Sequence, residues 1–171
     1  MLSIDNPPSS GRSGHIFQIN LSNGGVPKLG HSQAEVGYTG LVGDQHRDLQ
    51  SHGGPERALC LYSLERILAL QLEGHPVFPG AIGENLTISG LDWSLLVPGA
   101  RLRLGEHVLV ELIRYTTPCS NIAPFFANAD ISRVSQKTHP TWSRLYARVL
   151  QPGMLTVGDR VEMIPIARFR D

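Results

Sequence analysis

Frequent glycine and proline residues are the feature that most constrains what this chain can fold into. There are 18 Gly and 12 Pro in 171 residues, so the apolar runs between them are short. This pattern is typical of a domain built from many short strands rather than from long helices. It predicts strands near Gly14–Leu21, Arg57–Tyr62, Glu84–Ile88, Arg101–Leu104, His107–Tyr115, Tyr146–Leu150 and Arg160–Ile164.

One segment has a clear helical pattern. The stretch "SLERILALQLEG" predicts a helix that Ser63 caps and Gly74 ends. Shorter helical turns are expected around "LDWSLL" and from Asn121 onward. The expected apolar face of the long helix consists of Leu64, Ile67, Leu68 and Leu72.

Many short strands with few helices favour a closed or nearly closed barrel, because closure removes exposed sheet edges. The length fits one ordinary domain. We expect residues 1–13 to form a flexible N-terminus and residues 14–171 to form a single domain. Two late segments, "RLRLGEHVLVEL" and "MLTVGDRVEMIPI", resemble β-hairpins with glycine turns, which carry no chemistry by themselves.

The charge balance limits the class of partner. Lys plus Arg is 15 and Asp plus Glu is 15, which argues against a general nucleic-acid binder. A local basic pocket for a small anion remains possible, since nearly all the basic residues are Arg, which suits bidentate binding of phosphate or carboxylate. The start of the chain has no apolar leader, and no stretch is long and apolar enough to span a membrane. We therefore expect a cytoplasmic protein that binds neither membrane nor nucleic acid.

Two cysteines in a chain of this length do not indicate a disulfide scaffold. Cys60, in the apolar run "RALCLYS", is interpreted as a small core residue. Cys119 differs, because it follows Pro118 in a polar turn just beyond a predicted strand, where side chains tend to face a cleft. The residues alone leave open whether its thiol is inert or reactive. A nearby cation such as Arg114 would favour the thiolate, which is both a nucleophile and a soft metal ligand.

Two further turns contain candidate binding residues. In "SHGGPERALCLYS", His52, Gly53 and Gly54 form a loop whose backbone N–H groups could approach a ligand, and Arg57 could hold an anion there. Taken alone, the two glycines are better explained by a simple turn. Asn85 in "GENLTISG" could bind the edge of a heterocycle, or could simply complete a turn at a strand entrance.

A zinc site is the alternative that the histidines raise. His46 and His52, with Asp44 and Asp48, lie close together in the sequence. Their spacing matches neither an H-E-x-x-H helix nor a Cys/His cluster, so a zinc hydrolase is not favoured.

Several motifs in one order carry a family resemblance. The series "GLVGD…HGGPERALCLYS…GENLTISGL…PGARLRLG…RYTTPC…YARVLQPGMLTVGD" resembles the MOSC domain, named after the C-terminal region of molybdenum cofactor sulfurases, in its small stand-alone bacterial form. The resemblance extends from about Gly14 to Ile164. It implies a mainly β fold with a few helices, a β-barrel of the pyruvate kinase barrel-domain-like type.

The resemblance also implies a site. Cys119 matches the functional cysteine of the family, which would make it the catalytic residue and the metal ligand of a molybdenum–pterin cofactor (molybdopterin). The cofactor-binding residues would be His52, Gly53, Gly54 and Arg57 along one wall, Asn85 at the pterin or substrate, and Arg114 or Arg148 at the cofactor phosphate.

Two functions follow from the resemblance. One is an oxidoreductase that reduces N-hydroxylated compounds with electrons from a separate reductase, and the other is a non-catalytic carrier of sulfur or cofactor. The carrier would use a Cys119 persulfide that a separate cysteine desulfurase supplies. A third reading is a barrel used only for protein binding, with an unreactive Cys119. No pyridoxal phosphate is expected on this chain, because Lys28 and Lys137 are its only lysines and lie in no recognisable motif for it.

Overall fold

The computed structural model describes residues 10–45 and 53–165. Its one α-helix in this part, α1, spans Leu64–Leu72. Five short 3₁₀ turns are η1 (Pro55–Arg57), η2 (Trp93–Leu95), η3 (Ser120–Phe125), η4 (Ala127–Ala129) and η5 (Ile131–Val134). The strands are β1 (Ser13–Leu21), β2 (Leu29–His31), β3 (Gln33–Gly37), β4 (Gly40–Leu41), β5 (Leu59–Ser63), β6 (Leu86–Ser89), β7 (Arg101–Leu104), β8 (Val108–Tyr115), β9 (Leu145–Gln151), β10 (Gly153–Thr156) and β11 (Arg160–Ile164).

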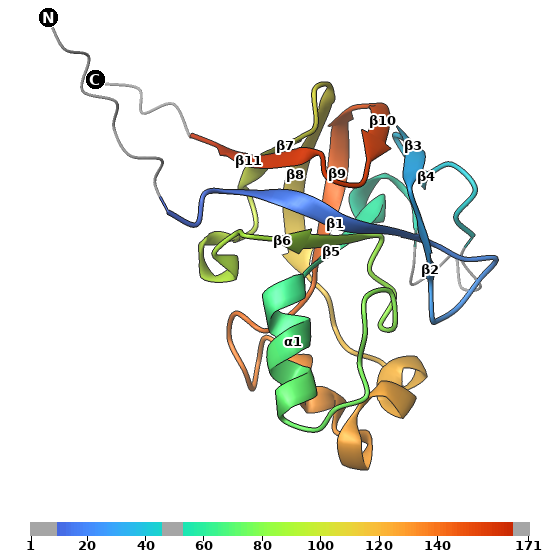
Figure 1. The fold of residues 1–171 in the computed structure, drawn as a ribbon, viewed down its shortest axis with the longest axis vertical. Helices are drawn as coiled ribbons and strands as arrows, with labels where there is room; N and C mark the ends of the chain where they lie inside the picture. Colours follow the sequence, from blue (N-terminus) through green and yellow to red (C-terminus); the bar gives the residue numbers. More distant parts are fainter. Residues whose placement is uncertain (1–9, 46–52, 166–171) are drawn as a thin grey trace, which may run out of the picture.

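Seven of these strands close into a barrel. Their order is β11-β7-β8-β9-β5-β6-β1, and the antiparallel pairing of β1 with β11 closes the ring. β2 adds to the outer edge of β1, while β10, β3 and β4 form a separate small sheet. Figure 1 shows α1 and the helical turns that follow β8 gathered at one end of the barrel. The predicted mainly β barrel with few helices is therefore confirmed.

Strand alternation separates the two faces of the barrel wall. In β9, Leu145, Ala147 and Val149 are buried and alternate with partly exposed residues. In β5, Leu59 and Leu61 pair with Ala147 and Leu145, so they lie on the same inner face. Between them, Cys60 pairs with Tyr146 and therefore faces the other way.

Several strand predictions agree closely with the structure. β7 and β11 have the predicted bounds, and β1, β6, β8 and β9 begin or end within two residues of them. The prediction that a strand starts at Arg57 is wrong, because this residue ends η1 and β5 begins only at Leu59. The sequence pattern also missed β2, β3 and β4. β2 has three exposed residues and β4 has two residues, so neither has an apolar face to detect.

Of the two predicted hairpins, the first is confirmed and the second is wrong. "RLRLGEHVLVEL" does form a hairpin between β7 and β8. In "MLTVGDRVEMIPI", however, β10 pairs with β3, whereas β11 pairs with β7 and β1. The intervening turn is bound at two places, since Val157 N–H donates to the carbonyl of Ser32, between β2 and β3, and Gly158 N–H donates to that of Ile16 in β1. This turn therefore passes the chain from the small sheet to the barrel.

The predicted apolar face of α1 is wrong in part. Ser63 caps the helix as expected, since its hydroxyl accepts from Arg66 N–H. The buried helix residues are Ile67 and Leu70, whereas Leu68 is 49% exposed and Leu72 is 91% exposed. The helix packs through the i, i+3 pair at 67 and 70, so the side chains at 68 and 72 point away from the barrel.

The predicted flexible segment 1–13 overlaps the barrel. β1 begins at Ser13, and the carbonyls of Gly11 and Arg12 accept hydrogen bonds from Asp92 and Met163. Residues 11–13 are thus bound to the barrel, while residues 1–9 lie outside the described part. None of the described helices has the length and apolarity needed to cross a bilayer.

Candidate functional site

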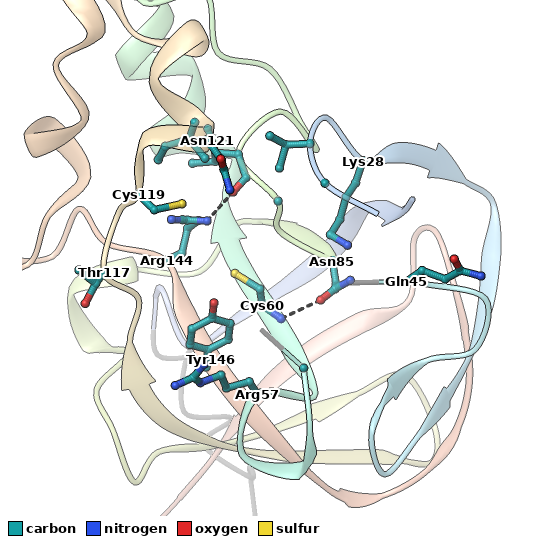
Figure 2. A pocket seen from close by; sticks show the side chains of 16 residues that line it. Lys28, Gln45, Arg57, Cys60, Asn85, Thr117, Cys119, Asn121, Arg144 and Tyr146 are labelled. Atoms are coloured by element: carbon teal, nitrogen blue, oxygen red, sulfur yellow. Dashed lines mark hydrogen bonds between the residues drawn. The ribbon is translucent and has the colours of Figure 1, made fainter. Parts of the chain in front are cut away.

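A cavity of about 280 Å³ lies on the outer face of the barrel wall made by β5 and β9. Its volume is near the lower end of the range for small-molecule sites, about 300–1,000 Å³. Residues that are far apart in the sequence line it, at positions 25, 26, 28, 45, 53, 57, 60, 82, 83, 85, 117, 119, 121, 122, 144 and 146. Figure 2 shows their side chains converging on one space. Such convergence of loops on a rigid scaffold is typical of a binding site.

Four of the residues singled out in the sequence come together here. Gly53, Arg57, Asn85 and Cys119 all line the cavity. Gly54 is not among the lining residues, although its positive φ of 81° begins the turn into η1. His52 lies outside the described residues.

Cys119 lies where the chain leaves the barrel. After β8 ends, Thr116 N–H donates to the carbonyl of Arg144 at 3.0 Å, which holds this strand end against the start of β9. Cys119 then forms the N-cap of η3, and its carbonyl accepts from Ile122 N–H. The thiol is partly exposed and free of any disulfide. This geometry fits the expectation of a cysteine that faces a cleft.

Cys60 also lines the cavity, which the sequence did not indicate. It is buried as predicted, but on the outer face of β5 rather than in the barrel interior. Burial raises the pKa of its thiol to about 11, so Cys60 stays protonated at neutral pH. The missed signal is the alternation in "LCLY", which puts the cysteine on the face opposite to Leu59 and Leu61.

Asn85 is held by its neighbours on both sides of its amide. Its Oδ1 accepts from the backbone N–H of Cys60 at 3.0 Å, and its Nδ2 donates to Asp44 Oδ2 at 2.8 Å. Asp44 also binds the buried ammonium of Lys28 at 2.6 Å. Asn85 therefore holds the cavity wall together. This structural role does not depend on where a ligand binds.

Glu84 lies behind this wall and does not line the cavity. Its Oε1 accepts from Gly80 N–H at 2.7 Å and from the Thr87 hydroxyl at 3.0 Å, while its Oε2 is buried without a partner in the described part of the chain. Burial raises the pKa of this carboxyl above its ordinary value. The folded protein thus binds this proton more tightly than an exposed glutamate would.

The arginines expected at a phosphate are placed differently from one another. Arg57 lines the cavity and lies 5.8 Å from the centroid of the Tyr146 ring. Arg114 lies over the same ring at 5.6 Å but is not a lining residue. Arg148 also does not line the cavity, and it forms ion pairs with Glu111 at 2.6 Å and Glu56 at 3.0 Å.

Arg144 is the basic residue that the sequence reasoning missed. It lines the cavity, is 7% exposed, and donates from Nη1 to the carbonyl of Ile82. It precedes β9 in "WSRLYARV", two residues ahead of Tyr146, but no turn motif marks it. The described lining residues include Lys28, Arg57 and Arg144 but no Asp or Glu. Of the three arginines expected at an anion, Arg57 therefore lines the cavity, and Arg144 joins it there instead of Arg114 and Arg148.

The alternative zinc site falls mostly outside the described residues, since His46, Asp48 and His52 are not part of them. Asp44 is described and is bound to Lys28 and Asn85. Within residues 10–45 and 53–165, no group of three or more His, Cys, Asp and Glu side chains is arranged to hold a metal ion.

The fold and the cavity define a β-barrel domain with a cysteine-containing site on its outer wall. The MOSC domain family matches residues 48–162, and the chain belongs to this family. This family is associated in general with the molybdenum cofactor.

Relatives with similar sequences include small proteins of bacteria. The chain is 34% identical to Protein YiiM of Escherichia coli (strain K12) over 134 residues, which cover 73% of this chain and 56% of that protein. It is 32% identical to the uncharacterized protein YflK of Bacillus subtilis (strain 168) over 123 residues, which cover 71% and 54%. The chain thus spans about half the length of these curated relatives.

Solved structures show the same fold. YiiM from Geobacillus stearothermophilus has a TM-score of 0.72 at 24% identity, over 91% of this chain and 77% of that one. The YuaD protein from Bacillus subtilis has a TM-score of 0.71 at 18% identity, over 88% of this chain and 95% of that one.

Proposed function

We propose that the cavity binds a molybdenum–pterin cofactor with the sulfur of Cys119 as a molybdenum ligand, and that the protein reduces N-hydroxylated compounds. One observation carries the proposal: a partly exposed thiol lines a cavity together with basic side chains. Family membership supports the choice of cofactor.

The described residues fit such a group in two respects. A thiolate is a soft ligand suited to a transition metal, and guanidinium groups suit the phosphate of a pterin cofactor. The cavity wall also has no side chain at Gly83, whose φ is +90°, so a ligand could approach the backbone closely there. A Cβ there would lie 3.2 Å from Val26 Cγ1 and 3.9 Å from Arg144 Nη1, so a side chain would crowd this wall.

When bound, the cofactor would supply the two-electron redox chemistry, while the protein supplies orientation and charge. Cys119, on the loop that follows β8, would hold the metal in the cavity. Arg57 and Arg144 would offset the negative charge of the bound group. Cys60 would not compete as a thiolate, because the pKa of its thiol is raised to about 11. Tyr146 likewise stays neutral at pH 7, since burial raises the pKa of its phenol to about 12.

The reductase activity has weaker support than the cofactor. A relative from Gibberella moniliformis named "Reductase" is 28% identical over 131 residues, which are 74% of this chain but 23% of that protein. The electrons would come from a separate reductase, as the family resemblance implies. The competing carrier function would use the same Cys119 as a persulfide.

Turnover and sulfur transfer can be measured on the same preparation. The chain is produced in a host that makes the pterin cofactor and, as control, in one that cannot. We expect reduced dye to be consumed with an amidoxime substrate by the first preparation and not by the second. Cyanide-labile sulfur on Cys119 without amidoxime turnover in either preparation would refute the reductase proposal in favour of the carrier.

A further inference from the structure

Arg144 is a buried cation whose charge no described carboxylate neutralises. Its side chain is 7% exposed, and its Nε is buried without a hydrogen-bond partner in the described residues. The other buried cation in the cavity wall, Lys28, is paired with Asp44 at 2.6 Å. Arg133 has such a partner as well, in Glu73 at 2.6 Å. Burying an arginine without a counter-charge costs stability, so its retention in a cavity points to a ligand.

The neighbouring acidic groups do not replace that counter-charge. The carboxyl of Glu84 is hydrogen-bonded to Gly80 and Thr87 instead, and within the described residues it forms no ion pair with Arg144. The thiol of Cys60 is neutral at pH 7, because burial raises its pKa to about 11. The guanidinium of Arg144 therefore presents a positive charge to the cavity that an anion from solution can neutralise.

We propose that Arg144 is the centre of an oxyanion site in this cavity, and that the site takes a phosphate-type group. The site would hold either the phosphate of the cofactor or an anionic group of a substrate. The identity of this natural ligand rests on the proposed function. A guanidinium is suited to this role, because its planar set of donors matches two oxygens of one phosphate. The side chains of Thr117 and Asn121 line the same cavity and can add neutral donors.

The position of Arg144 links this oxyanion site to Cys119. The carbonyl of Arg144 accepts from Thr116 N–H at 3.0 Å. Cys119 lies three residues after Thr116, on the loop that follows β8. Both side chains extend into the cavity shown in Figure 2. An oxyanion bound at Arg144 should therefore shield the Cys119 thiol from alkylating reagents.

Titration calorimetry with inorganic phosphate tests the site directly. The full chain is produced in a host that cannot make the pterin cofactor, and wild type is compared with Arg144→Lys and Arg144→Met. Since hydrogen bonds to a charged group contribute about 1.5–3 kcal/mol, we expect Arg144→Met to weaken phosphate binding by roughly 10- to 100-fold. Arg144→Lys keeps the charge but loses the planar set of donors. Its affinity for phosphate should therefore lie between those of wild type and Arg144→Met.

The matched control is Arg148→Gln, because Arg148 is on the same strand region but is ion-paired and does not line the cavity. This variant should bind phosphate within about twofold of wild type, since its contribution comes only through screened, long-range charge. A second readout is the alkylation rate of Cys119, which phosphate should slow in wild type and in Arg148→Gln but not in Arg144→Met.

Wild type that does not bind phosphate would overturn the inference, as would equal affinity in wild type and Arg144→Lys or Arg144→Met. If Arg144→Met does not fold, the lysine variant and the alkylation rates decide. Repeating the titration with cofactor-loaded protein identifies the source of the group: blocked phosphate binding assigns the site to the cofactor, and retained binding assigns it to a substrate. Because phosphate binding needs no metal, protein that binds phosphate through Arg144 but never contains molybdenum would refute the proposed function alone.

Discussion

Thr116 and Arg144 are joined by a backbone hydrogen bond of 3.0 Å from N–H to carbonyl, just beyond the last paired residues of β8 and β9. At this point the barrel wall ends and the chain that carries Cys119 turns away from it. The contact therefore fixes the base of the Cys119 loop against the residue that brings a buried positive charge into the cavity. The hydrogen bond therefore holds the Cys119 loop and Arg144 at the same cavity.

Asn85 should be important for stability even though it lines the cavity. In Asn85→Ala, the N–H of Cys60 and the carboxylate of Asp44 each lose a buried hydrogen-bond partner. Each such loss costs about 1–3 kcal/mol, so we expect unfolding in denaturant to show a decrease of roughly 2–6 kcal/mol. Asn121→Ala is the matched control, because Asn121 is exposed and should stay within about 0.5 kcal/mol. Equal stability of the two variants would show that the Asn85 network contributes little.

Cys60→Ser should lower the melting temperature moderately. Cys60 is 5% exposed, and burying a hydroxyl costs about 1–3 kcal/mol when it lacks a good partner. Because Cys60 faces the cavity rather than the barrel interior, we expect a loss near the low end, about 1 kcal/mol. For a domain of this size that corresponds to a shift of about 2–4 °C by calorimetry. An unchanged or higher melting temperature would contradict the burial argument.

Glu84 should make the folded protein less stable as pH rises. Burial raises the folded-state pKa of this carboxyl above the ordinary value of 4.5, so the folded state binds this proton more tightly than the unfolded state does. The stability that the protonated carboxyl provides is fully present below about pH 4.5, and it is lost as pH rises from there towards the raised pKa.

Glu84→Gln isolates this contribution, because glutamine imitates the protonated acid and can keep its oxygen towards Gly80 and Thr87. We expect the variant to gain stability relative to wild type as the pH is raised above 4.5, measured by denaturant unfolding between pH 4 and 8. A difference between the two proteins that does not change with pH would refute the raised pKa.

The sequence predicted the barrel because its strands are regular and its turns carry glycine. β7 and β8, for example, alternate cleanly around the Gly105 turn and were predicted as a hairpin. Prediction failed where tertiary packing decides. β10 has an ordinary strand pattern, but only its position in space makes β3 its partner. The apolar face of α1 was misplaced because Leu68 and Leu72 have suitable chemistry yet face away from the barrel.

The residues of the candidate site were likewise predictable in part. Cys119, Gly53, Arg57 and Asn85 belong to marked turns at strand ends, and they do line one cavity. Arg144 could not be found in this way, because nothing local distinguishes a buried arginine from an exposed one ahead of a strand. Its side chain is bound to the carbonyl of Ile82 and its backbone to Thr116, and both partners are distant in the sequence. Arg148 sits in an equally suggestive motif but is ion-paired outside the cavity.

X-ray absorption at the molybdenum edge of wild type and Cys119→Ser tests the central claim most directly, because one spectrum reports both the metal content and its sulfur ligands. Both proteins are produced in a cofactor-producing host and matched for fold by melting temperature. Because Cys119 is partly exposed, the substitution should change stability by no more than about half a kcal/mol. Serine does not ionise near neutral pH and is a harder ligand, so we expect the variant to lose molybdenum or to retain it with one sulfur ligand fewer than wild type. Equal molybdenum content with the same sulfur shell in both proteins would show that Cys119 is not a molybdenum ligand.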